Sequence, residues 1–250
     1  MSKKKNLNPA SEGLAPARRI LAIETATDVS SVALFEDGKL VGLQENHANR
    51  THARLVTVMI ERLLQDLEWT PRDLSAVCVA KGPGSYTGLR VGVSVAKGLC
   101  MALDIPLLSI SSLEALAWSV RDVAQVMDAR ICPMIDARRM EVYTQTFAVS
   151  EGSGPHPENE PHALIVEAGS YAEELSKGKV LFLGDGAAKC AEVFANQGNA
   201  IFLGSRLSSA AHLGYAADLN LQAGKTEDLV LFEPFYLKEF VATLSSKKLV

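Results

Sequence analysis

Cysteine is scarce in this chain, and long apolar runs are missing. The four cysteines lie far apart among apolar neighbours, so they predict reduced core residues of a cytoplasmic protein rather than a disulfide framework or a zinc site. No run of eighteen apolar residues occurs, because Lys97 interrupts the most apolar predicted helix. The apolar stretch that follows Arg18 and Arg19 ends at Glu24, as a strand would, so we expect neither a membrane span nor a cleavable export signal.

Histidine is equally sparse, and its spacing does not favour a metal site. His47 and His52 are five residues apart across a strand-to-helix junction, and His156 and His162 lie in a predicted loop. A metal site needs such side chains clustered with acidic or sulfur partners. We therefore predict no metal bound by this chain.

The charge is divided unevenly along the chain. The formal net charge is −4, but residues 1–19 are basic, which leaves 20 basic against 28 acidic residues, or −8, in the remainder. An acidic body argues that this chain alone is not a main nucleic-acid-binding surface. We interpret residues 1–18 as a flexible basic tail.

The glycine-rich stretch from Lys81 to Gly98 is the most informative segment that is present. It links a strand to a helix, yet its third glycine, Gly88, comes one residue too late for a dinucleotide-binding loop. Pro83 removes one N–H donor, and Leu89 stands where an ATP-binding P-loop needs Lys followed by Ser or Thr. Ser94 falls about two turns inside the helix, which argues against a nucleophile elbow.

Hydrophobic periodicity predicts a mixed α/β first half. The order is β-β-β-α-β-α-β, with strands at 20–26, 30–36, 39–46, 75–80 and 106–110 and helices at 52–67 and 87–103. This order is typical of the ribonuclease-H-like half of actin-like proteins, a likeness of fold alone.

The second half repeats the plan. A strand ending at Asp136 is followed by a polar turn and a return strand at 141–147, so Asp136 takes the place that Glu24 has in the first half. We predict an exposed excursion at 150–162, a strand at 179–183 and a last helix near 208–223. The expected lobes are 19–110 and 111–250, with the last segment returning to the first lobe.

Several motifs in one order resemble the bacterial TsaB family, also called YeaZ. They cover nearly everything after the tail: Ile20-Leu-Ala-Ile-Glu24-Thr25-Ala-Thr27, Lys81-Gly-Pro-Gly-Ser-Tyr-Thr-Gly-Leu-Arg90, Ser111-Ser-Leu-Glu-Ala-Leu116, Ile135-Asp-Ala-Arg-Arg139, Gly184-Asp-Gly-Ala187 and Phe235-Tyr-Leu-Lys238.

The resemblance implies a two-lobed actin-like (ASKHA) fold and a role in making threonylcarbamoyladenosine beside the tRNA anticodon. In that family the catalytic paralogue TsaD transfers the threonylcarbamoyl group, TsaB is its non-catalytic partner, and the ATPase TsaE joins the pair. The implied ATP and metal are held by those partner subunits, and tRNA is reached only through the complex. Self-association is expected when TsaD is absent.

The residues themselves agree with a non-catalytic role. The paralogue has a His-x-x-x-His metal site where this chain has Ser112-Leu113-Glu114-Ala115-Leu116. The first turn differs as well, because nucleotide-binding relatives have Asp and Gly before a Thr-rich turn that wraps phosphate, and this chain has Glu24-Thr25-Ala26-Thr27. We expect Arg139 to lie beside a cleft between the lobes or to face solvent. The cleft is at most a vestigial nucleotide site, and it is formed by Glu24, Thr25, Thr27, Asp136, Arg138, Gly184 and Gly186. An actin-like ATPase or small-molecule kinase is the alternative. A peptidase is a third reading, unsupported by any acid, base and nucleophile set.

Small residues recur every fourth position along the helix after the glycine turn. Gly88, Gly92, Ala96 and Cys100 share one face, which permits close approach of a second helix, either inside the lobe or from a partner. With the broad apolar face of 55–67, they predict a four-helix interface. We expect Gly92→Leu to block it without unfolding the monomer. The predicted interface residues are Leu55, Met59, Leu63, Tyr86, Gly88, Leu89, Gly92, Val93 and Ala96.

Overall fold

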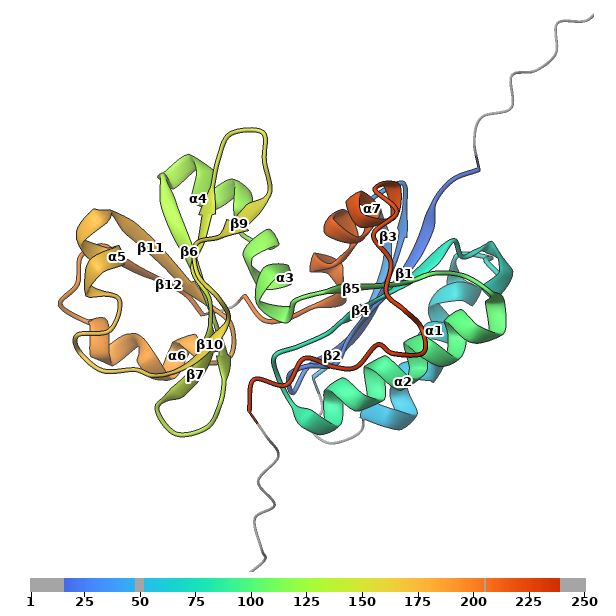
Figure 1. The fold of residues 1–250 in the computed structure, drawn as a ribbon, viewed down its shortest axis with the longest axis horizontal. Helices are drawn as coiled ribbons and strands as arrows, with labels where there is room; N and C mark the ends of the chain where they lie inside the picture. Colours follow the sequence, from blue (N-terminus) through green and yellow to red (C-terminus); the bar gives the residue numbers. More distant parts are fainter. Residues whose placement is uncertain (1–15, 48–51, 205, 239–250) are drawn as a thin grey trace, which may run out of the picture.

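The computed structural model describes residues 16–47, 52–204 and 206–238, which form two lobes joined near their middle (Figure 1). The first lobe is built on a five-stranded sheet in the order β3-β2-β1-β4-β5. Central strand β1 pairs antiparallel with β2 and parallel with β4, and β4 pairs parallel with β5. The bounds are β1 Arg19–Glu24, β2 Ser30–Glu36, β3 Lys39–Asn46, β4 Ala76–Ala80 and β5 Leu107–Ile110.

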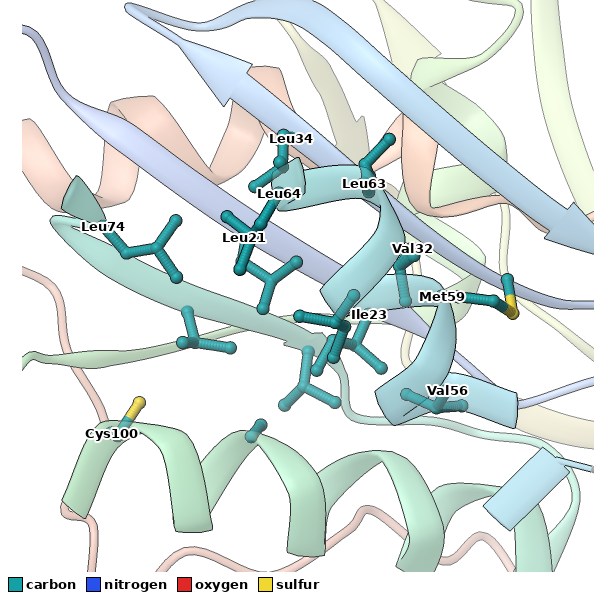
Figure 2. Packing of buried hydrophobic residues seen from close by; sticks show 14 of the residues in the cluster. Leu21, Ile23, Val32, Leu34, Val56, Met59, Leu63, Leu64, Leu74 and Cys100 are labelled. Atoms are coloured by element: carbon teal, nitrogen blue, oxygen red, sulfur yellow. The ribbon is translucent and has the colours of Figure 1, made fainter. Parts of the chain in front are cut away.

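Two long helices cover one face of this sheet. They are α1 (His52–Asp66) and α2 (Tyr86–Leu103), with the short η1 (Pro71–Asp73) between them. Leu21 and Ile23 of β1 point into the layer between sheet and helices, where Met59 and Leu64 of α1 and Cys100 of α2 meet them (Figure 2). Burial of these side chains, worth roughly 1.5–3 kcal/mol for each large one, fixes both helices.

The opposite face is covered by helices from later in the chain. These are η3 (Ala210–His212) and α7 (Gly214–Gln222), which lie over the first sheet although they follow the second lobe (Figure 1). The helix α3 (Ser112–Trp118) lies between the lobes, with Ala115 in the core of the first and Leu116 in the core of the second. Leu213 and Ala217 join the cluster of Ile20 and Phe35. Gly214 lets α7 approach closely, since a Cβ there would lie 2.0 Å from the Phe35 ring.

The second lobe repeats the first sheet. Strands β10, β7, β6, β11 and β12 lie in that order, so β6 occupies the place of β1, β7 that of β2 and β11 that of β4. Glu24 and Asp136 are both the last residues of their central strands, as predicted. The sheet strands are β6 Ala129–Asp136, β7 Glu141–Thr144, β10 His162–Ile165, β11 Lys179–Leu183 and β12 Ala200–Leu203, and the helices are α4 Arg121–Met127, α5 Ala172–Lys177, α6 Ala187–Cys190 and η2 Ala191–Phe194.

Three local predictions need correction. The return strand expected at 141–147 is divided into β7 and β8 (Phe147–Val149), because Thr146 gives its backbone N–H to the Asn159 side chain instead of to a strand. The excursion at 150–162 contains β9 (Pro155–Pro157), which pairs with β8. The helix expected near 208–223 is likewise broken into η3 and α7.

Residues 224–238, the terminal segment, cross back over α2 toward the second lobe (Figure 1). Lys97 of α2 donates to the carbonyls of Val230 at 3.1 Å and Phe232 at 3.0 Å. At the far end, the Lys238 Nζ lies 2.5 Å from both carboxylate oxygens of Glu141 in the second lobe. The terminal segment therefore contacts both lobes.

The cysteines agree with the sequence analysis. All four cysteines are free and buried. Within the described ranges, no helix has the length and apolar character needed to cross a membrane.

Candidate functional site

The glycine turn packs against the turn between β1 and β2. The Ser85 N–H donates to the Ala26 carbonyl at 2.6 Å, and the Thr25 hydroxyl donates to the Gly88 carbonyl at 2.8 Å. A Cβ on Gly84 would lie 2.2 Å from the Ala26 oxygen, and one on Gly88 would lie 2.0 Å from the Thr25 oxygen. These glycines are required because two backbone segments of the same lobe touch there.

This contact corrects most of the predicted partner interface. The small face of α2 is turned inward, and Gly92 is so close to the β1 end that a Cβ would lie 2.3 Å from the Thr25 Oγ1. Seven of the predicted residues are buried in the lobe's own core: Met59, Leu63, Gly88, Leu89, Gly92, Val93 and Ala96. The expectation that Gly92→Leu spares the monomer is wrong for the same reason.

The accessible surface of the two helices lies on the other side. Thr87, Ser94 and Gly98 form an exposed ridge of small residues on α2, and a Cβ on Gly98 would meet no atom within 4 Å. Of the predicted interface, Leu55 and Tyr86 are half-buried and remain accessible. We call this ridge, together with the groove beside it, the α1/α2 surface.

The groove runs between α1 and α2 and is mainly apolar. Its volume is about 530 Å³, and its lining includes Thr57, Leu64, Trp69, Val95, Gly98 and Leu99. An exposed apolar groove of this kind is typical of a ligand or partner site. The sequence could have indicated this exposed face, since Ser94 and Gly98 are also four residues apart. The row of small residues on the buried face is more regular, and the prediction was therefore made for that face.

The second group of predicted residues lies where the central strands of both lobes end. Glu24 is completely buried, and its Oε1 accepts the Ala26 N–H at 2.6 Å. Its Oε2 has no hydrogen-bond partner among the described residues. Burial raises the pKa of Glu24 to about 7, and the charge of Asp185 adds to the rise.

Asp185, in the second lobe, is the carboxylate whose charge acts on Glu24 in the first lobe. Its Oδ1 accepts the backbone N–H of Asp136 at 3.0 Å. Burial raises the pKa of Asp185, although its side chain keeps solvent contact, and the carboxylates of Asp136 and Asp28 raise it further. The sequence analysis quoted this residue within a motif but did not single it out, because only the fold places it between Glu24 and Asp136.

Four other predicted cleft residues, two threonines and two glycines, are engaged in local structure, whereas the Arg138 side chain is exposed. The Thr27 hydroxyl donates to the Val29 carbonyl at 3.5 Å, and the Thr25 hydroxyl is bound to Gly88. Gly184 has φ +101°, and a Cβ there would lie 2.4 Å from the Met134 oxygen. A Cβ on Gly186 would also crowd this strand, at 3.0 Å from the same oxygen. The two glycines thus serve close packing on β6.

The remaining polar candidates do not assemble into a site. His47 lies 3.5 Å from Glu45. The rings of His156 in β9 and His162 in β10, which the sequence had placed in a loop, each contact a backbone carbonyl two residues earlier in the chain. The side chain of His52 lies outside the described part. Across residues 16–47, 52–204 and 206–238, no three His, Cys, Asp or Glu side chains are grouped to hold a metal.

The duplicated sheet order defines an actin-like, two-lobed protein, and comparisons with known proteins identify the branch. The TsaD family, described as tRNA N6-adenosine threonylcarbamoyltransferase, matches residues 39–245. A tRNA threonylcarbamoyladenosine biosynthesis protein TsaB from Escherichia coli is 31% identical over 90% of this chain and 96% of its own. One from Bacillus subtilis is 36% identical over 66% of this chain and 70% of its own.

A solved structure agrees. YeaZ from Pseudomonas aeruginosa superposes with a TM-score of 0.75 at 26% identity, covering 88% of this chain and all of the other. The chain therefore belongs to the TsaD-related proteins and, among them, to the TsaB (YeaZ) family.

Proposed function

We propose that this chain is a non-catalytic subunit in the synthesis of threonylcarbamoyladenosine in tRNA, and that it binds a TsaD-type enzyme through the α1/α2 surface. The observation that carries the proposal is the exposed apolar groove beside the ridge of Thr87, Ser94 and Gly98. Small side chains let a partner helix approach closely, and the groove offers apolar surface for that helix to bury. Two copies of the chain would associate through the same surface when the partner is missing.

The region around Glu24 supports a non-catalytic role. In an actin-like nucleotide site, backbone N–H groups of the first turn would face phosphate, but here the Glu24 carboxylate accepts the Ala26 N–H. When ionised, a buried carboxyl group in that position would repel a phosphate group, and the neighbouring Thr25 hydroxyl is bound to Gly88. In this proposal the partner subunits, which include a TsaE-type ATPase, bind ATP and metal and carry out the group transfer. The complex acts in the cytoplasm.

Gly98→Leu tests the docking surface. The added side chain enters open space in the monomer, so the fold should be kept, while partner affinity should fall roughly tenfold or more because the ridge is no longer flat. Gly198→Leu is the matched control, since a Cβ there also meets no atom within 4 Å and the residue lies in the second lobe.

The measurement is titration calorimetry of each variant with purified TsaD-type enzyme, followed by an assay of tRNA modification. Equal affinity of Gly98→Leu and Gly198→Leu would exclude the α1/α2 surface. ATP hydrolysis by the isolated chain, or unchanged modification when it is omitted, would overturn the proposed function and favour an ATPase or kinase.

A further inference from the structure

The turn between β6 and β7 holds two arginines in a backbone conformation that side chains seldom adopt. Arg138 has φ +73° and Arg139 has φ +49°, both in the left-handed region. Each such residue costs about 1 kcal/mol or more, and Asn or Gly would occupy the positions more readily. Strain of this kind at exposed side chains raises the question of what the side chains do.

Both guanidinium groups are free to bind. The side chains are exposed, and neither makes a hydrogen bond or ion pair within the described residues. Only the backbone of Arg138 is held, its N–H donating to the Asp136 Oδ1 at 2.7 Å. Two unpaired guanidinium groups thus stand next to each other at the tip of a hairpin.

Two of the nearby carboxylates, those of Asp136 and Glu141, are already paired with other cations, while Asp185 accepts the Asp136 backbone N–H. Lys189 lies 2.5 Å from the Asp136 Oδ1, and Lys238 binds Glu141. Because these two carboxylates already form ion pairs with lysines, they do not depend on the arginines for a counter-charge. The turn therefore presents two unpaired cations on an otherwise acidic body, at the edge of the second lobe where the described chain ends at Lys238 (Figure 1).

We propose that Arg138 and Arg139 bind the phosphate backbone of RNA. This inference rests on the proposed function, which brings the chain to a tRNA, and it adds a direct contact to a chain that otherwise reaches RNA only through its partner. Guanidinium groups match phosphate oxygens with two parallel donors, and their exposure at a hairpin tip suits an extended polyanion rather than an enclosed nucleotide.

The double variant Arg138→Asn, Arg139→Gly separates binding from folding. Asn and Gly both tolerate positive φ, so the thermal midpoint should be unchanged or raised while the two charges are lost. The control is the double variant Lys179→Asn, Lys225→Asn, which removes two exposed cations elsewhere, one at the other end of the second sheet and one in the first lobe. The control and the arginine variant therefore have the same net charge.

The experiment measures tRNA affinity of the complex with the TsaD-type enzyme as a function of salt. The Arg138→Asn, Arg139→Gly complex should bind roughly tenfold more weakly, and its salt dependence should correspond to one or two fewer phosphate contacts. The lysine control should bind like the unaltered complex. Equal tRNA affinity of the arginine and lysine variants would overturn this inference, whereas failure of the unaltered chain to form the complex would overturn the proposed function instead.

Discussion

Thr25 and Gly88 are joined twice, by a 2.8 Å hydrogen bond from the Thr25 hydroxyl to the Gly88 carbonyl and by a close approach of the Thr25 carbonyl to the Gly88 Cα. This contact connects the β1–β2 turn to the first turn of α2. The glycine-rich stretch therefore acts inside the lobe, and the partner surface that we propose lies on the opposite side of the helix.

Gly88→Ala should destabilise the monomer. The new methyl group would lie 2.0 Å from the Thr25 oxygen, so backbone must move, at a cost of about 2 kcal/mol or more. Gly98→Ala is the control, and it should stabilise the helix by up to about 1 kcal/mol because its methyl enters open space. Urea unfolding measures both, and equal free energies of unfolding for the two variants would contradict the contact.

Glu24 should make stability depend on pH between about 4.5 and 7. Its folded pKa, about 7, lies above the ordinary value of 4.5, so the folded state holds the proton more tightly than the unfolded state. The contribution is complete below pH 4.5 and is lost as pH rises through 7, to a total of about 3 kcal/mol.

Glu24→Gln isolates this effect, since the amide keeps an acceptor for the Ala26 N–H but does not titrate. The difference in unfolding free energy between wild type and Glu24→Gln should move in favour of the variant as pH rises from 4.5 to 8. Glu151→Gln, at an exposed position, provides the reference. A difference that stays constant across this range would show that Glu24 titrates normally.

Lys97→Met should loosen the terminal segment without unfolding the lobe. The variant loses the bonds to the carbonyls of Val230 and Phe232 but keeps the length and apolar contacts of the side chain. Hydrogen exchange measured by mass spectrometry should speed up in 228–236, while global stability changes by less than about 1 kcal/mol. Unchanged exchange in this segment would mean that Lys97 does not hold it.

The sequence predicted the elements of the first lobe closely because short apolar runs bounded by turn residues in β1 and β2, alternation in β3 and helical spacing in α1 reflect burial directly. Its failures concern contacts between segments. The row from Gly88 to Cys100 indicates close packing but does not say against what, and Asp185 becomes a neighbour of Glu24 only when two lobes are assembled.

The sequence by itself determined the duplicated strand order and the family to which the chain belongs, because both depend on local pattern and motif. Only the tertiary structure decided which side of α2 faces solvent, where the last helix packs and how Glu24 is buried. The physical reason is that burial and close approach are set by segments far apart in the chain, such as Thr25 against Gly88 and Phe35 against Gly214.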